Sequence, residues 1–337
     1  MTKKETHSAP QAEDQGETMI SNTSKNDTDH KNLVFVGTYS LVFVAGLILN
    51  VIALVVFCRY TKLRSHTIVY MTNLALADLL LVSTLPVRIY YYLGFSGLSQ
   101  NLCEGLSLVL LVNMYGSIFL LACMSFDRCM AVCYPMSSRV KEGRKKAPLV
   151  CLGVWMLTVG ASLPTYLFKK GTEDSQTSCF GSTPIYAIQP GAVFSTLTIG
   201  FGIPLATMMT CSWFLIKAIS RSTVAQTDVI DSRKIQRMIT VSLLIFLVCF
   251  LPYHLILGLL YFYRQSTLPP LVTAFQYSLT FACLNAMLDP LAYYFTTETF
   301  RNNVDMNAVR KMWPLHSHSS DGNPPHVPLN TSTSIRE

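Results

Sequence analysis

Seven long apolar segments run through this chain, with short polar stretches between them. About 20 apolar residues are needed for an α-helix to cross the hydrocarbon core of a bilayer. Charged residues make up 13% of the 337 residues, whereas a soluble domain averages about 25%. The segments also lack the alternating pattern of a transmembrane β-strand. We therefore predict an all-α membrane protein, a bundle of seven helices at about 34–58, 67–92, 103–133, 148–168, 188–217, 237–262 and 271–295.

Basic residues gather on one side of this predicted bundle. Arginine and lysine are frequent in the segments 59–64, 139–146, 221–237 and 301–311. The loops of the opposite side contain only Lys169, Lys170 and Arg264. Because cytoplasmic loops carry the excess of positive charge, the first set of loops is expected in the cytosol. We predict a multi-pass plasma-membrane protein with an extracellular N-terminus.

The two ends of the chain differ from the bundle in composition. The polar N-terminal stretch has no apolar signal-peptide region, so the first span is expected to act as the insertion signal. Asn22 and Asn26 begin sequons for N-glycosylation there. We divide the chain into a disordered extracellular tail at 1–32, a transmembrane domain at 33–296, an amphipathic helix on the inner leaflet at 297–312 and a disordered cytosolic tail at 313–337.

Two aspartates, Asp78 and Asp289, lie deep inside the second and seventh spans. A carboxylate at the bilayer centre costs roughly 2.5–3.5 kcal/mol on insertion scales and is by default a functional-site hypothesis. Asn113 and Ser117 are four residues apart, as are Asn285 and Asp289, so each pair shares one helix face. These five side chains either satisfy one another by hydrogen bonds, with one acid protonated, or surround an ion or water.

The inner end of the third span contains Asp127 and Arg128, with Tyr134-Pro135 shortly after. Alone, this acid–base pair is also typical of interfacial residues that extend to the lipid headgroups. Six further signatures occur in order in the other spans. They are Asn50, Asp78, Trp155, Pro204, Cys249-Phe250-Leu251-Pro252 and Asp289-Pro290-Leu291-Ala292-Tyr293.

Together these signatures resemble the rhodopsin-like family of G-protein-coupled receptors, over about residues 33–312. The resemblance implies a ligand-controlled bundle without enzymatic activity. Heterotrimeric G proteins are the implied partners, together with arrestin and a receptor kinase at the Ser/Thr-rich tail and the surrounding membrane lipids, but no nucleic acid. Three departures from the usual family residues, at Cys129, Phe250 and Asp289, are common in the purinergic and lysolipid branch. Ser212 stands where the fifth span usually has tyrosine.

The resemblance also assigns roles to individual residues. Asp127 is implied to hold Arg128 at rest, and Arg128 to meet the G protein on activation. A hydrated sodium ion is implied among the five polar residues around Asp78 and Asp289; no other metal or cofactor is expected. The implied path of the signal through the sixth and seventh spans is Phe246, Phe250, Pro252, Asp289, Pro290 and Tyr293.

Two cysteines are placed to form a disulfide on the outer side. Cys103 opens the third span, and Cys179 lies in the outer loop after the fourth span. Both face the oxidising side of the membrane, which favours a disulfide over two free thiols. The N-terminal tail and the third outer loop contain no cysteine. The second extracellular disulfide typical of nucleotide receptors therefore cannot form.

Basic residues at the outer mouth indicate the charge of the ligand. Arg88 lies inside the outer half of the second span, while Lys169, Lys170 and Arg264 lie at the ends of spans. Contact with lipid phosphates explains Lys169 and Lys170 well and Arg264 fairly. Arg88 is harder to explain in that way because it lies within the span. We predict that Arg88 and Arg264 bind an anionic headgroup.

Four stretches narrow the resemblance within the family. LPVRIYYY, NMYGSIFL, VCLGVW and CFLPYH look like the lysophosphatidic acid receptors of the purinergic-related group, in which the basic residue at the position of Arg88 contacts phosphate. The first outer loop, GFSGLSQNLC, lacks the usual Trp-x-Phe motif, as in related receptors for lysophosphatidylinositol and kynurenate-like acids. Besides the basic residues, the residues predicted to contact the ligand, chiefly its tail, are Tyr92, Leu110, Met114 and Tyr115.

The sequence also bears on the alternative functions, which are other receptor types, a channel or transporter, and an enzyme. A nucleotide receptor or a receptor for a small organic acid of the same branch is the nearest alternative, and a channel or transporter is the alternative from another class. No internal repeat of the kind found in many transporters links the two halves. Leu110 stands where amine receptors have aspartate, and Cys283 where opsins have the retinal lysine. No HExxH, GxSxG or phosphate-loop motif indicates an enzyme.

Overall fold

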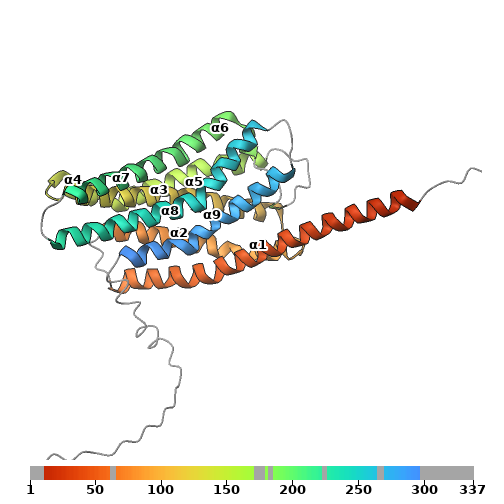
Figure 1. The fold of residues 1–337 in the computed structure, drawn as a ribbon, viewed down its shortest axis with the longest axis horizontal. Coiled ribbons are helices and arrows are strands. Elements are labelled where there is room, and N and C mark those ends of the chain that lie inside the picture. The colour runs from red at the N-terminus through yellow and green to blue at the C-terminus, as the bar shows by residue number, and fades with distance from the viewer. Residues whose placement is uncertain are drawn as a thin grey trace, which may run out of the picture.

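The computed structural model of the chain describes residues 11–60, 66–170, 179–180, 185–221, 226–263 and 269–296. Seven helical segments in this part of the chain are long and apolar enough to cross a membrane, which confirms the predicted fold class. They lie side by side in one bundle (Figure 1). The elements are α1 (Gln11–Tyr60), α2 (His66–Tyr92), α3 (Gln100–Cys133), α4 (Ser138–Arg144), α5 (Ala147–Lys170), η1 (Ile185–Ile188), α6 (Pro190–Ser195), η2 (Thr196–Gly202), α7 (Ile203–Arg221), α8 (Gln226–Phe262) and α9 (Pro269–Thr296).

The first helix begins earlier than the apolar pattern predicts. The structure gives α1 from Gln11, immediately after Pro10, and the helix extends beyond the bundle (Figure 1). We expected disorder over 1–32 because this stretch is polar. It contains no proline after Pro10, however, and proline is the residue that most strongly stops a helix. The predicted amphipathic helix at 297–312 and the tail at 313–337 lie outside the described residues.

The fifth span is not one continuous α-helix. It consists of α6, the π-helical turn η2 and α7. At the end of η2 the backbone N–H of Ile203 donates to the carbonyl oxygen of Thr198, five residues earlier. Pro204 follows directly and has no N–H to donate, so the regular i→i−4 ladder is interrupted at this point. The proline therefore accounts for a wide turn that the apolar pattern does not reveal.

The third helix occupies the centre of the bundle. α3 packs against α2, α5, α7 and α8, whereas α1 packs against α2 and α9. Large apolar side chains remain exposed on the outer faces, for example Leu149 and Met156 on α5. An exposed apolar face of this kind is expected where a helix contacts lipid. The bundle thus keeps its polar side chains inside.

A close contact joins α1 to α2 and α9. The Asn50 side-chain amide donates to the carbonyl oxygens of Gly46 (2.9 Å) and Ala286 (2.7 Å). Gly46 allows this approach, because a Cβ there would lie 2.9 Å from the Val82 Cγ2 atom. α9 is therefore held beside α2, and this packing brings Asp289 near Asp78.

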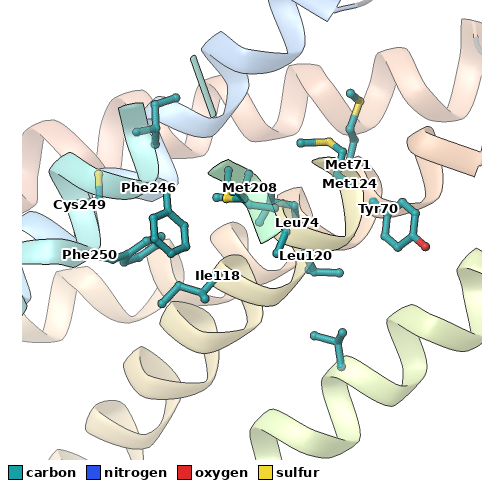
Figure 2. Close-up of a cluster of buried hydrophobic side chains, with 14 of the residues drawn as sticks. Tyr70, Met71, Leu74, Ile118, Leu120, Met124, Met208, Phe246, Cys249 and Phe250 are labelled. Carbon is teal, nitrogen blue, oxygen red and sulfur yellow. The ribbon is translucent and has the colours of Figure 1, made fainter. Parts of the chain in front are cut away.

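The inner half of the bundle contains the main apolar core. Figure 2 shows Phe246 and Phe250 of α8 lying over Ile118 of α3, with Met208 of α7 nearby. The rings of Phe246 and Phe250 are 5.6 Å apart in an edge-on arrangement, and both side chains are fully buried. Because cores of this kind are close-packed, a movement of α8 must be accompanied by rearrangement at α3 and α7.

Candidate functional site

Arg88 of α2 is a buried cation that no described carboxylate neutralises. Its side chain is only 3% exposed, and one terminal nitrogen donates to the Leu106 carbonyl oxygen at 3.2 Å. Its guanidinium carbon lies 4.4 Å from the centre of the Phe180 ring. The Nε atom has no hydrogen-bond partner, and no carboxylate pairs with Arg88 among the residues whose side chains are described. A buried charge is costly unless paired, so this arrangement is suited to receiving an anion.

Aromatic rings surround the position of Arg88. Phe35 of α1 packs against Tyr92 at 4.8 Å and Tyr277 at 4.9 Å between ring centres. Tyr91 meets Phe180 edge-on at 5.1 Å. Phe180 thus lies between the outer aromatic residues and the guanidinium of Arg88. Tyr92, a predicted ligand residue, belongs to this cluster.

A cavity of about 860 Å³ opens outside the aromatic cluster. Its lining includes Tyr91, Tyr92, Cys179 and Gln276, together with Lys31. The Lys31 ammonium donates to the Gln276 side-chain carbonyl at 3.0 Å, which joins α1 to α9. Sequence reasoning missed Lys31 by treating residues 1–32 as a tail. A basic residue close to the outer end of the first span was the signal that could have found it.

A second, more apolar cavity of about 290 Å³ lies between α3, α5 and the α6–η2 segment. Tyr115, as predicted, lines it, and so does its neighbour Leu111. Leu110 and Met114 do not; they are 3% and 1% exposed and belong to the apolar core clusters. Successive residues of an α-helix point about 100° apart, so a shift of one position selects a different face. Contact of Leu110 and Met114 with the ligand tail stays a prediction.

A tyrosine pair ties the second outer loop to the sixth span. The hydroxyls of Tyr186, in η1, and Tyr253, in α8, are hydrogen-bonded. Burial raises the pKa of Tyr186 to about 12, so its phenol remains neutral at physiological pH. Tyr253 packs against Phe275 of α9, with 5.7 Å between ring centres. Neither tyrosine was singled out from the sequence.

The predicted disulfide is present. Cys103, at the start of α3, is bonded to Cys179, and their Cα atoms are 5.4 Å apart. Because Phe180 is the next residue, the bond holds this aromatic ring near Arg88. The disulfide is thus part of the outer site as well as of the scaffold.

Replacing Cys179 with serine should destabilise the receptor and weaken ligand binding. Loss of a native disulfide typically costs about 2–5 kcal/mol, and here it also frees the backbone next to Phe180. A lower Tm of the purified receptor is the direct measure. Cys58→Ser, which removes an exposed free thiol, is the matched control. An unchanged Tm for Cys179→Ser would contradict the assigned role of the bond.

The five polar residues predicted to share the centre of the bundle are brought together and buried. Asn113 donates to one oxygen of Asp78 at 3.2 Å, and Asn285 donates to one oxygen of Asp289 at 2.9 Å. The remaining oxygens of both carboxyls have no hydrogen-bond partner, and the same is true of the Ser117 hydroxyl and the Asn285 carbonyl oxygen. The first alternative, full mutual satisfaction, does not hold. Buried oxygen atoms that lack a hydrogen-bond donor fit a cation or water.

The acid at the inner end of α3 has a different partner from the one expected. Arg144, the last residue of α4, donates to the two Asp127 oxygens at 2.8 and 3.0 Å, and the Thr67 hydroxyl donates at 3.0 Å. This pairing raises the pKa of the Arg144 guanidinium, which stays charged at physiological pH. Arg128 does not form the expected ion pair with Asp127, and its Nε atom is unpaired. The ion pair therefore fastens α4 to α3.

The start of the predicted signal path joins two elements, η2 and α8. Phe201 of η2 stacks on Phe246 at 5.3 Å and on His254 at 4.2 Å between ring centres. Sequence reasoning named Phe246 but missed Phe201 and His254. Pro252 and Pro290 lie inside α8 and α9 as expected. The π-helical turn is thus in direct contact with the aromatic residues of the sixth span.

Several predicted residues lie outside what the structure describes. The backbone of Lys169 and Lys170 forms the last turn of α5, but their side chains are not described, nor is that of Tyr293 in α9. Arg264 falls between the described ranges. The sequons at Asn22 and Asn26 lie in α1, where glycosylation stays a prediction. The roles of these residues stay predictions.

Seven membrane-spanning helices, an outer disulfide and two buried acids within the spans define a receptor of the seven-helix class. Residues 49–293 match the family described as 7 transmembrane receptor (rhodopsin family), and the chain belongs to this family. It is therefore a G-protein-coupled receptor, a multi-pass protein of the plasma membrane whose partners are G proteins.

Curated relatives narrow the branch of the family. The chain is 35% identical to lysophosphatidic acid receptor 6 of Homo sapiens over 283 residues, which cover 80% of this chain and 82% of that protein. It is 32% identical to human lysophosphatidic acid receptor 4 over 311 residues, with 89% and 84% covered. It is also 31% identical to a purinoceptor of Gallus gallus over 291 residues, with 82% and 88% covered. The chain thus belongs to the branch that contains both groups.

Proposed function

We propose that this receptor detects an anionic lipid mediator, lysophosphatidic acid or a related lysophospholipid. The observation that carries the proposal is the burial of Arg88 without a carboxylate partner among the described side chains. A receptor that keeps an uncompensated cation in its outer half gains from any ligand that supplies a phosphate or carboxylate. The names of the relatives at 32–35% identity support the same ligand class.

The head and the tail of such a ligand meet different parts of the site. Arg88 binds the headgroup, with Lys31 at the outer cavity and Arg264, Lys169 and Lys170 as further basic residues. The apolar tail enters the cavity lined by Leu111 and Tyr115. Phe180 must turn aside for the headgroup to reach the guanidinium, because its ring now covers that group.

The receptor acts by a shift in population and makes or breaks no bond. A ligand that binds the active bundle more tightly than the resting one moves the equilibrium between them. Movement of α8 is transmitted to the inner half of the bundle through the contacts among Phe201, Phe246 and Phe250. Arg128 then engages the G protein, together with the basic inner end of α8 at Arg233 and Arg237. Arrestin and a receptor kinase act on the Ser/Thr-rich tail.

The oxygen cluster at the centre of the bundle is proposed to hold a sodium ion. The unpaired oxygens of Asp78, Ser117, Asn285 and Asp289 are of the hard type that binds such cations. A bound cation supplies positive charge between two carboxyls that otherwise repel each other. These residues orient α3 and α9 relative to α2, so the ion would favour one arrangement of the bundle.

Sodium is expected to lower agonist affinity, and Asp78→Asn should remove this effect. Coupling between two sites in one protein typically amounts to about fivefold or more in affinity. The measurement is agonist binding in sodium chloride and in choline chloride at equal ionic strength. Thr84→Val, which removes a buried hydroxyl of α2 away from the cluster, serves as the control. Equal sodium sensitivity of Asp78→Asn and the unmodified receptor would refute the site.

A screen of G-protein dissociation tests the ligand class. The receptor is exposed in turn to lysophospholipids, nucleotides and small organic acids, and dissociation of several G-protein classes is recorded. A response to lysophospholipids alone supports the proposal. A response to nucleotides would favour the alternative represented by the purinoceptor of Gallus gallus. Ion flux without any nucleotide exchange on a G protein would instead indicate a channel or transporter.

A further inference from the structure

A groove of about 710 Å³ lies at the inner end of the bundle, outside the ligand site and the sodium cluster. α3, α4, α5 and α7 form its walls. Its apolar wall includes Phe119, Phe126, Ile203 and Pro204. At its inner end lie two arginines of α4, Arg139 and Arg144. The Asp127 carboxylate also lines this end of the groove, where Arg144 neutralises it, and the groove lies apart from the outer site.

The apolar wall of the groove faces the membrane. Phe126 is 53% exposed and Ile203 is 60% exposed, and both belong to helices that cross the membrane. Exposed side chains at these positions are in contact with lipid chains in the bilayer. The groove therefore opens to the acyl region of the inner leaflet, because α4 is part of a cytosolic loop.

The inner end of the groove is strongly basic. α4 contains three basic residues and one acid, and two further lysines, Lys145 and Lys146, follow it directly. Arg139 is exposed and has no carboxylate partner among the described side chains. Arg144 uses Nε and one terminal nitrogen for Asp127, so its other terminal nitrogen is not engaged by that carboxylate. Among the described side chains, no carboxylate engages the Arg139 guanidinium or this terminal nitrogen of Arg144, so both are left for an anion.

We propose that this groove binds an anionic phospholipid of the inner leaflet. Its headgroup lies on Arg139 and Arg144, and one acyl chain runs along Phe119, Phe126 and Ile203. Basic pockets on the cytoplasmic side of transmembrane helices have the charge that anionic headgroups require. The surrounding leaflet supplies such lipids at high local concentration, and the apolar wall accounts for the chain. Because Arg144 also binds Asp127, the bound lipid touches the arginine that neutralises the acid of the inner switch.

Photolabelling of the full-length receptor tests the site. The receptor is placed in nanodiscs of phosphatidylcholine with a trace of phosphatidylserine that carries a diazirine in one acyl chain, and labelled peptides are identified by mass spectrometry. We expect labelling of α3 around Phe126 and of α7 around Ile203. Unlabelled phosphatidylserine should compete, and unlabelled phosphatidylcholine should not.

Two pairs of variants make the test specific. Arg139→Gln should reduce labelling of these peptides about fivefold, since one basic residue near the membrane surface contributes about that factor. Lys146→Gln removes an exposed charge that does not line the groove and should leave labelling unchanged. Thr207→Trp fills the groove and should abolish labelling, while Thr210→Trp, one turn further along α7 and outside the lining, should not.

Three outcomes would overturn the proposal. The first is labelling of α3 and α7 no stronger than that of the lipid-facing side of α1. The second is full labelling of Arg139→Gln. The third is protection of the groove by a second copy of the chain, seen as cross-links between two receptors in place of lipid adducts. All three can be read while ligand responses at the outer site remain intact, so failure here is distinct from failure of the proposed function.

Discussion

Arg88→Ala is expected to abolish the response to lysophosphatidic acid while the receptor still reaches the cell surface. Truncating one partner of a buried, hydrogen-bonded charge pair typically costs about 2–5 kcal/mol. A loss of that size lowers potency by at least about thirtyfold. The measurement is a concentration–response curve for G-protein dissociation, normalised to surface expression. Tyr90→Phe, on the same helix and more exposed, is the control.

Further substitutions of Arg88 distinguish ligand binding from a structural role. Arg88 has no carboxylate partner among the described residues, so its charge contributes little to the stability of the empty receptor. Arg88→Leu should therefore leave the Tm of the ligand-free receptor unchanged or raise it. Arg88→Lys keeps the charge but loses the planar fork, and should give an intermediate potency. Unchanged potency of Arg88→Ala would exclude the proposed contact with the headgroup.

Asp127→Asn is expected to raise basal nucleotide exchange about tenfold. The ion pair with Arg144 and the bond from Thr67 hold the inner ends of α2, α3 and α4 together. Neutralising one partner of a fully buried pair costs about 3–5 kcal/mol, and this pair, with the Arg144 side chain 23% exposed, should cost less. If the pair is stronger in the resting bundle, half of that energy suffices for a tenfold shift in population.

The assay is GTPγS binding without agonist. Arg144→Gln should reproduce the effect, and the double variant should add little to either single change, as expected for residues that act as a pair. Thr67→Val removes one hydrogen bond from a neutral group and should have a smaller effect. Unchanged basal exchange in Asp127→Asn would show that the ion pair does not restrain the bundle.

The bundle was predictable because its signal is local. Each span carries its own apolar run, and the charge of each loop fixes the side of the membrane without knowledge of the packing. The disulfide was predictable for a similar reason, since Cys103 and Cys179 are the pair expected on the oxidising side. The π-helical turn was not, because Pro204 marks an interruption without specifying how the backbone accommodates it.

The details of the site depend on packing between helices, which the sequence does not display. Asp127 pairs with Arg144 of α4, whereas the sequence favoured Arg128 because it is the adjacent residue. Leu111, which lines the apolar cavity beside the predicted Tyr115, was not singled out, because α3 is apolar on most of its surface and periodicity cannot distinguish its faces. The polar cluster around Asp78 and Asp289 was easier to predict, because polar side chains within a membrane-spanning bundle are normally partnered by other polar groups.

The ring of Phe180 has a consequence for the time course of signalling. It covers Arg88, and the disulfide one residue before it fixes the backbone before any ligand arrives. Ordering the backbone next to this ring is therefore not a cost of ligand binding. Only a rotation of the Phe180 side chain separates the covered guanidinium of Arg88 from the accessible one. An anion beneath the ring can leave only when that rotation recurs. Residence time, more than the rate of encounter, should then determine how long a single ligand keeps this receptor active.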